Sequence, residues 1–327
     1  MPLLREVRGA LTAFAVVLCG LLVLVSYDFG IPGQALLQTL RFHIGAALLG
    51  IMLLHLATGA WWRAILFLAV AAISIGQGGL MLLHQQEARV AVTAQPSKPL
   101  FRMLSFNLLQ SNLGNGQRLA SYVATSDADV VLIMEAGPIK RYADELAKVY
   151  PYRTQCTARG ACDVFLLSKT PLLDPQVSSM SRVWENRLVV ASTVIGGQTV
   201  NIVGAHMTKP YFDDVAEEEA RGMGQAISRR EGPLVLAGDF NSAAWSQNID
   251  RLARAHKLIP PPYYPATWPV RLGPLGVPID NMWTRGPLYI SSIYALEDPI
   301  GSNHRGLMAE LSLAEAASVP PSAPPDP

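Results

Sequence analysis

Six polar residues of the kinds that bind metal ions and transfer protons stand beside short apolar runs in the last two thirds of the chain. They are Asn107, Glu135, His206, Asp239, Asp280 and His304. Carboxylate and amide oxygens suit hard cations such as Mg²⁺, and imidazole exchanges protons near neutral pH. A single Asp or Asn at such a place is ordinarily a helix cap or a turn residue. Six in one domain instead predict a common ligand site.

The apolar runs have the length and composition of β-strands. Strands are predicted at 101–107, 130–135, 164–168, 188–195, 199–206, 234–239, 279–283 and 307–313, with amphipathic helices near 117–126, 140–149, 213–230 and 244–256. Gly196-Gly197 is a strong turn signal between two of the strands. Strand pairs mixed with helices predict an α/β domain of two packed sheets with helices outside. The polar residues fall mainly at strand ends, which meet at one edge of a sheet.

Six segments carry a family resemblance. The sequences LSFNLL, LIMEAG, GAHMTKP, LAGDFNS, PIDNMW and GSNHRGLMAEL follow in the order and approximate spacing of the endonuclease/exonuclease/phosphatase superfamily. The resemblance covers residues 100–313 and implies the deoxyribonuclease-I-like fold, an αββα sandwich of two sheets flanked by helices. YPYRTQC to DVFLLSKTPL also resembles the middle hairpin of the family, and ATWP to IDNMW its segment before the late Asp.

The resemblance implies hydrolysis of a phosphate ester. This reaction needs an activated water, neutralised phosphoryl charge and help for the leaving oxygen. Glu135 is then the principal ligand of Mg²⁺, with Mn²⁺ as an alternative ion, and Asn107 is a neutral second ligand. Asp280 fixes the ring of His304. This pair either takes a proton from water or stabilises the transition state as imidazolium.

The resemblance assigns the remaining roles to the ends of two other strands. Asp239 orients or activates the attacking water, and Asn241 donates to a phosphoryl oxygen. His206 is either a second phosphate donor or the general acid for the leaving group. Lys209 is either a contact to a substrate phosphate or a solvated loop charge. The Pro- and aromatic-rich stretch 259–278 is either an apolar entrance to the site or a rigid surface loop.

One position departs from the family pattern. The last motif reads Ser302-Asn303-His304, where the family usually has Ser-Asp-His. Asn keeps the shape of Asp but lacks its charge, and that Asp lies beside the metal in the family. The number of metal ions is therefore open. A non-catalytic binding or scaffold protein becomes an alternative to an enzyme.

Three apolar runs occupy the first 84 residues, at 9–26, 44–62 and 64–84. Each has the roughly 20 residues that cross a hydrocarbon core of about 30 Å. We therefore predict three transmembrane helices that anchor residues 1–84 in a lipid bilayer, as in a membrane-anchored bacterial member of the superfamily. A linker at 85–99, the catalytic domain at 100–313 and a disordered Pro/Ala tail at 314–327 complete the expected organisation.

Basic residues predict the orientation of these helices. Arg5, Arg8 and Arg63 lie on one side of the membrane and Arg41 and Arg89 on the other, which favours a cytoplasmic N-terminus. Three spans of the inner membrane then place everything after residue 85 on the periplasmic, extracytoplasmic side.

The predicted extracytoplasmic location affects the expected redox state of two cysteines. Cys156 and Cys162 bracket the sequence CTARGAC, in which a short-loop disulfide is sterically plausible. In an oxidising compartment they are predicted to pair. Two free thiols are the alternative.

Charge narrows the choice of substrate. Residues 1–97 hold five of the 26 Lys/Arg and three of the 25 Asp/Glu residues, which leaves 21 and 22 for the rest of the chain. This balance argues against nucleic acid, whose binders usually show a basic excess. We expect a membrane-anchored phosphoesterase acting on a phosphorylated lipid or small molecule, with an extracytoplasmic nuclease as the alternative. The sequence indicates no protein partner.

Overall fold

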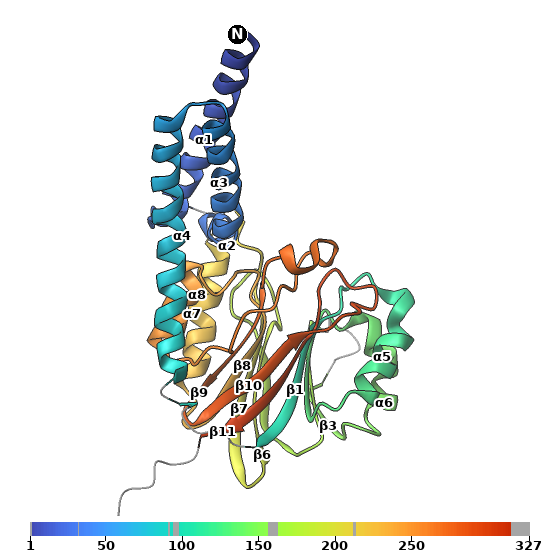
Figure 1. The fold of residues 1–327 in the computed structure, drawn as a ribbon. Helices are drawn as coiled ribbons and strands as arrows, with labels where there is room; N and C mark the ends of the chain where they lie inside the picture. Colours follow the sequence, from blue (N-terminus) through green and yellow to red (C-terminus); the bar gives the residue numbers. More distant parts are fainter. Residues whose placement is uncertain are drawn as a thin grey trace, which may run out of the picture.

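A computed structural model of the protein describes residues 2–31, 33–90, 92–93, 98–155, 163–211 and 214–314. Two β-sheets pack face to face with helices outside them, and a bundle of long helices rises from one end (Figure 1). The strand order is β10-β11-β1-β2-β4-β3 in one sheet and β5-β6-β7-β8-β9 in the other. This architecture confirms the predicted two-sheet α/β sandwich.

The strands carry apolar residues on both faces because each sheet is covered on both sides. The first sheet contains β1 (Pro99–Asn107), β2 (Val130–Met134), β3 (Tyr152–Arg153), β4 (Val164–Ser168), β10 (Leu288–Ala295) and β11 (Leu307–Leu313). The second contains β5 (Leu172–Ser178), β6 (Leu188–Ile195), β7 (Gln198–His206), β8 (Leu234–Asp239) and β9 (Asp280–Arg285). Met103 and Leu132 face Val189 and Val235 in the core between the sheets.

Helices cover the two outer faces. They are η1 (Leu113–Asn115), α5 (Gly116–Thr125), η2 (Gly137–Tyr142), α6 (Ala143–Leu146), α7 (Val215–Ser228) and α8 (Gln247–Ala255), whereas η3 (Val270–Leu275) lies in the segment before β9 and near α3. Phe106 and Val131 belong to the outer core of the first sheet, and Val203 and Leu236 pack in that of the second. The single helix predicted at 140–149 is a 3-10 segment followed by the four residues of α6.

Strand directions bring several strand ends to one edge. β1 is parallel to β2, and β7 is parallel to β8. The antiparallel neighbours of these strands begin where they end, since Met134 pairs with Val164 and Asp239 with Asp280. The carboxyl ends of four strands and the amino ends of β4, β9 and β11 therefore surround one edge of the sandwich, which we call the site edge.

Four helices precede the sandwich: α1 (Pro2–Ser26), α2 (Gln34–Thr39), α3 (Arg41–Ala57) and α4 (Trp61–Val90). Among the described residues, α1 and α4 are long and apolar enough to cross a membrane, whereas α3 has 17 residues. Two helices of the described residues, rather than the three predicted, therefore qualify as membrane spans by length and composition, and the expected span 44–62 runs past the end of α3 at Ala57. The chain turns at Thr58 and at Gly59, which has a φ of +79°, so that Trp61 starts α4.

The predicted linker start at residue 85 is also wrong, because α4 runs on to Val90 beside the two-sheet sandwich. Gln85 donates to the carbonyl of Ala244, and Arg89 donates to the carbonyl of Ile290. These contacts join segments that lie about 160 and 200 residues apart in the chain. They extend the helix past its apolar stretch.

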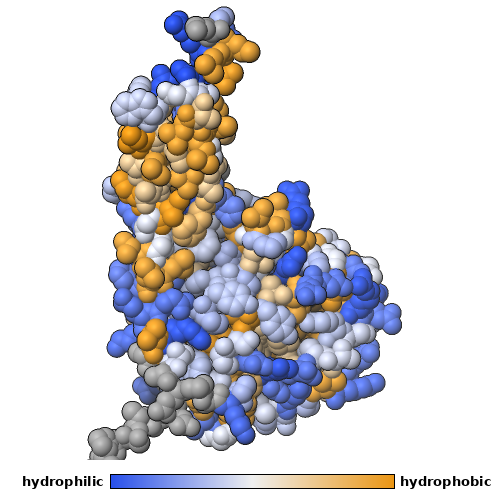
Figure 2. All heavy atoms as spheres, in the orientation of Figure 1, coloured by the Kyte–Doolittle hydropathy of each residue, from blue (hydrophilic) through white to orange (hydrophobic). Residues whose placement is uncertain are grey.

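Helices α1, α3 and α4 pack side by side as one bundle (Figure 1). Its centre buries Ala15, Leu22, Leu48 and Ala71. Its outer surface exposes large apolar side chains, and Figure 2 shows them as a hydrophobic zone above the two-sheet sandwich. The bundle therefore has a core of its own and an apolar exterior as well.

Candidate active site

The site edge collects all six polar residues with which the sequence analysis began. Asn107 ends β1, Glu135 follows β2, and His206 and Asp239 end β7 and β8, while Asp280 starts β9 and His304 precedes β11. Five of these side chains are buried, and the side chain of Glu135 is 24% exposed. The arrangement forms one polar cluster whose solvent-facing carboxylate is Glu135.

His304 is held by a carboxylate. Its Nδ1 donates to Oδ2 of Asp280 at 2.9 Å, as the resemblance implies. Its backbone N–H donates to Oγ of Ser302, which in turn donates to the carbonyl of Asn107. Burial disfavours the charged ring, but the negative charges of Asp280 and Asp239 outweigh burial and raise the pKa of His304 to about 9.

His206 is held in the same way by a residue that the sequence analysis missed. Its Nδ1 donates to Oδ1 of Asp163 at 2.8 Å, and Nε of Arg187 lies 2.5 Å from the other carboxylate oxygen. Burial opposes the charged ring, yet the hydrogen bond and charge of Asp163 raise the pKa of His206. Asp163 directly precedes β4, as Asp280 opens β9. An acidic residue at the start of an antiparallel strand was the available signal.

Both imidazoles point toward Asp239. Nε2 of His206 lies 3.8 Å and Nε2 of His304 lies 3.7 Å from Oδ2 of Asp239. The other oxygen, Oδ1, accepts the backbone N–H of Asn241 at 2.9 Å. Burial and the nearby negative charge of Asp280 raise the pKa of Asp239, against the opposing effect of the two imidazoles. Two ring donors thus converge on one carboxylate oxygen.

Glu135 and Asn107 form the outer side of the cluster. Nδ2 of Asn107 donates to Glu135 Oε1 at 3.1 Å and to Asp239 Oδ2 at 3.0 Å. Its amide oxygen, the expected metal ligand, instead accepts the N–H of Leu109 at 3.0 Å. Glu135 Oε2 accepts the N–H of Gln110 at 2.5 Å. The side-chain amide of Asn107 thus places its N–H donors between the carboxylates of Glu135 and Asp239.

This donor set fits a hard divalent cation. Three carboxylates share the cluster, and Oδ1 of Asp280 is buried without a hydrogen-bond partner among the described residues. Ligand atoms of Asp239, Asp280 and His304 all lie within 4.8 Å of one another. Asp280 and His304 are already bonded to each other, however. Glu135 stays the predicted ligand of the cation, because its 24% exposure leaves room for the water ligands that Mg²⁺ retains.

The other predicted site residues lie on the loops of the same edge. Nδ2 of Asn241 donates to the carbonyl of Met207 and so ties the loops after β7 and β8 together. Lys209 is exposed on the loop after β7. Oδ1 of Asn303 is buried without a hydrogen-bond partner among the described residues. Cys156 and Cys162 lie outside the described residues.

The sequence profile of the Endonuclease/Exonuclease/phosphatase family matches residues 104–304, which is more than half of the chain. The chain belongs to this family. Phosphoester hydrolysis is the general activity of its members, and the match spans every residue of the polar cluster. No curated protein sequence matches the chain.

Solved structures with the family fold resemble this family member. A beta toxin from Staphylococcus aureus with bound magnesium ions has 14% identity and a TM-score of 0.52, covering 64% of this chain and 99% of that one. Sphingomyelinase C from Streptomyces griseocarneus has 17% identity and a TM-score of 0.50, with 65% and 99% covered. D. rerio TDP2 complexed with a single-strand DNA product has 17% and 0.53, with 65% and 98% covered. At these identities the likeness establishes the fold alone.

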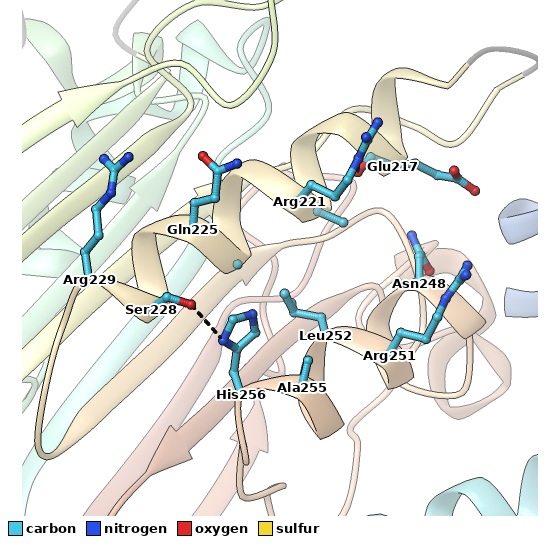
Figure 3. Close-up of a pocket in the computed structure, with 12 residues that line it drawn as sticks. Glu217, Arg221, Gln225, Ser228, Arg229, Asn248, Arg251, Leu252, Ala255 and His256 are labelled. Carbon is cyan, nitrogen blue, oxygen red and sulfur yellow. Dashed lines mark hydrogen bonds between the residues drawn. The ribbon is translucent and has the colours of Figure 1, made fainter.

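A cavity of about 680 Å³ lies elsewhere, between α7 and α8 (Figure 3). Its floor includes Ala220 and Leu252, its rim includes Arg221 and Arg251, and His256 contacts Ser228 within it. None of the residues of the polar cluster lines it. The candidate active site at the site edge is therefore separate from this cavity.

The helical bundle forms hydrogen bonds with the loop that follows Asp239. Oγ1 of Thr39, in α2, accepts the N–H of Ala243 and lies 3.0 Å from Oγ of Ser246. The indole of Trp245 donates to the carbonyl of Thr39, and Gln85 from α4 donates to the carbonyl of Ala244. These buried bonds fix a loop that begins at a site residue.

Replacing Thr39 by valine is expected to lower kcat about tenfold with little change in KM for a small substrate. The variant leaves the N–H of Ala243 buried without its acceptor, and small displacements of a catalytic loop are costly. Thr39→Ser, which keeps the hydroxyl, should restore kcat. Thr58→Val, at the far end of α3, is the matched control. Equal kcat in Thr39→Val and wild type would show that the loop does not depend on α2.

Replacing Asp163 by asparagine is expected to lower kcat about 10- to 100-fold, the usual effect of losing the partner that orients a functional imidazole. The change removes the charge that favours protonated His206, so the pKa of this ring should also fall. Asp144→Asn, an exposed carboxylate bonded to Arg153, is the control. An unchanged pKa of His206 would contradict the pairing with Asp163.

The pH dependence of His304 gives a further test in metal-free protein. The ring should titrate near pH 9 in nuclear magnetic resonance spectra, and Asp280→Asn should lower this pKa because a negative charge is removed. A raised folded pKa adds stability below the ordinary pKa of about 6.5, and this stability is lost as pH rises through 9. The stability gap between wild type and Asp280→Asn should therefore be larger at pH 6 than at pH 10. A gap that is constant with pH would refute the assignment.

Proposed function

We propose that the chain is a membrane-anchored hydrolase that cleaves a phosphate ester with the help of a divalent metal ion. The observation that supports this most strongly is the pair of carboxylate-held imidazoles, His206 and His304, aimed at Asp239 beside the solvent-facing Glu135. Such a cluster offers proton acceptors, cationic donors and a cation ligand within one small space. It therefore serves all three requirements of phosphoester hydrolysis.

The residues divide the reaction between them. Asp239 accepts a proton from the water whose oxygen attacks phosphorus, and the ester P–O bond breaks on the opposite side. His304, kept cationic by Asp280, donates to a phosphoryl oxygen, and His206 donates to another oxygen or protonates the leaving group. The second amide N–H of Asn241 is left for the same oxygens. Glu135, with Asn107 behind it, would hold Mg²⁺ or Mn²⁺, which neutralises phosphoryl charge when bound.

The anchor supports a substrate at a membrane. Helices α1 and α4 are long enough to span a bilayer, and α3 packs alongside both of them in the bundle. An apolar exterior on such a bundle is typical of helices that face lipid. We propose that all three helices cross the membrane. Tethering concentrates the catalytic domain near lipid phosphoesters, and its nearly neutral charge gives little attraction for DNA.

The distribution of basic residues supports an extracytoplasmic catalytic domain. Arg5, Arg8 and Arg63 lie toward the end of the bundle away from the domain. Arg41 lies at the other end, but its guanidinium is buried and donates to the carbonyls of Val25 and Ser74. It is therefore a structural group rather than a charge at the membrane surface. The positive-inside rule then favours a cytoplasmic N-terminus more clearly.

Hydrolysis by the full-length chain, purified in detergent, tests the proposal. Phosphate or head-group release should require Mg²⁺ or Mn²⁺, stop with a chelator, and be absent from His304→Ala prepared in the same way. Phospholipid, a small soluble phosphodiester, nucleotides and single-stranded DNA are the substrates to compare. Preference for DNA with a steep fall in rate at high salt would make the protein a nuclease. Absence of turnover on every substrate would favour a binding protein.

Fusions test the topology. A reporter enzyme that works only outside the cytoplasm should be active when it is joined to the C-terminus. Cys156 and Cys162 should resist thiol labelling under non-reducing conditions. A reporter that works only in the cytoplasm would reverse the orientation. Labelling of both cysteines would exclude the disulfide.

A further inference from the structure

Exposed apolar side chains of the catalytic domain gather at the site edge. Eleven large hydrophobic residues are exposed among the described residues from 98 onward, and six of them lie on loops around the site. These six are Leu113, Val183, Trp184, Tyr211, Leu272 and Leu275. Single exposed apolar residues need no explanation, whereas a group on one face indicates an interaction surface.

Chain direction places these loops around the polar cluster. Leu113 follows β1, which ends at Asn107, and Tyr211 follows β7, which ends at His206. Val183 and Trp184 precede β6, whose first residue pairs with Ala205, the neighbour of His206. Three separate loops therefore present apolar side chains beside the site residues.

A fourth segment reaches further toward the membrane helices. Trp268 and Val277 pair as the two sides of a narrow excursion with η3 at its tip. At its base, Oγ1 of Thr267 accepts the backbone N–H of Asp280. Leu272 and Leu275 are 47% and 72% exposed at the tip. The 259–278 stretch thus includes an exposed apolar tip on a base that supports the site.

The excursion meets the bundle where the apolar exterior begins. The carbonyl of Leu275 lies 2.8 Å from Nε2 of His43, in the first turn of α3. Figure 1 shows this orange helical segment level with α2, and Figure 2 shows hydrophobic side chains there on the upper rim of the domain. Thr39, at the end of α2, bonds to the loop after Asp239. The site edge therefore lies at the same height along the molecule as the end of the helical bundle that adjoins the sandwich.

Charge on the same loops matches a lipid surface. Arg182, Lys209 and Arg271 are exposed beside the apolar residues, and Glu185 and Asp214 are the exposed acidic groups among the described residues of these segments. Basic residues close to a bilayer are attracted to its anionic head groups. Apolar tips with basic neighbours are the usual composition of interfacial membrane contacts.

We infer that the site edge is a second membrane contact, in which the η3 tip and the neighbouring loops rest on the bilayer that anchors the chain. The active site then opens toward the lipid head groups of the adjoining leaflet, and its substrate is a phosphoester carried by a lipid of that leaflet. The assignment of a lipid substrate rests on the proposed hydrolase function. The membrane contact itself does not.

Quenching by labelled lipid tests the contact directly. A fluorophore is placed at Leu275→Cys in the full-length chain, with its three native cysteines replaced by serine, and the protein is reconstituted in phosphatidylcholine and phosphatidylglycerol vesicles. Nitroxide-labelled phosphatidylcholine should quench it several-fold more than the same fluorophore at Val194→Cys. Val194 is 44% exposed at the opposite end of β6. Equal quenching at the two positions would overturn the inference.

Turnover separates this inference from the proposed function. Leu272→Glu with Leu275→Glu should lower phospholipid hydrolysis in vesicles at least tenfold and leave hydrolysis of a soluble phosphodiester unchanged. Val194→Glu should change neither rate. Equal loss on both substrates would mean that the tip supports the site instead of docking on lipid, and an unchanged lipid rate would also refute the inference. A wild-type chain with metal-dependent turnover of the soluble ester but none of lipid would refute the lipid substrate while preserving the hydrolase.

Discussion

Replacing His304 by alanine is expected to lower kcat for phosphoester hydrolysis by about 10²–10⁴-fold, the usual range for a positioned acid–base group. The ring lies 2.9 Å from Asp280 through Nδ1 and faces Asp239 through Nε2. Alanine removes the cationic donor and leaves two buried carboxylates facing each other. The loss should appear in kcat, because the imidazolium interacts most strongly with charge that develops in the transition state.

Two comparisons make this result specific. His256→Ala, in the wall of the cavity in Figure 3, removes a histidine that is not part of the polar cluster and should leave kcat unchanged. The double variant His304→Ala with Asp280→Asn should lose little more than His304→Ala alone, since residues that act as a unit are not additive. Near-wild-type turnover in a folded His304→Ala variant would remove this residue from the mechanism.

The sequence was informative wherever a site residue ended a continuous apolar strand. Asn107, His206 and Asp239 each close a strand that is buried on both faces, so the pattern located both the strand and its end. Asp163 escaped notice because its role depends on a strand that runs the opposite way. Only the pairing of Met134 with Val164 reveals that β4 begins at the site edge.

Two edge strands and the end of α4 were also missed, because no continuous apolar run marks them in the sequence. β5 contains Pro175 and mostly exposed residues, and β10 contains polar residues within an alternating pattern, so neither has a continuous apolar run. Pro and polar residues are ordinary in strands with one free edge. The extension of α4 to Val90 likewise depends on contacts of Gln85 and Arg89 with distant segments.

Hydrogen bonds also connect the bundle with the loops of the site, and composition alone could not indicate them. α2 is six residues long and sits between two longer helices, yet Thr39 at its end supports the loop after Asp239. The η3 excursion touches α3 at one end and supports Asp280 at the other. If the bundle is the proposed membrane anchor, its bonds to these loops fix the orientation of the candidate site as well as its distance from the membrane.

Replacing Glu135 by glutamine is expected to lower metal-dependent turnover by about 10²–10⁴-fold, because a bound cation contributes several kcal/mol to transition-state stabilisation. Glutamine keeps the size of the side chain and removes the charge that would hold the ion. The affinity for Mn²⁺, measured by calorimetry, should fall together with kcat. This joint loss distinguishes a metal ligand from a residue that only supports the fold.

Glu310→Gln is the matched control for this substitution. Glu310 is 26% exposed in its side chain, against 24% for Glu135, but it pairs with Arg102 on the sheet away from the site edge. Its replacement should leave Mn²⁺ affinity and kcat unchanged. If Glu135→Gln kept its Mn²⁺ affinity and lost turnover, the ion would have to be held by Asp239, Asp280 and His304, whose ligand atoms already lie within 4.8 Å of one another. His304 would then be a ligand instead of a proton donor, and the pKa of its ring would fall on metal binding rather than stay near 9.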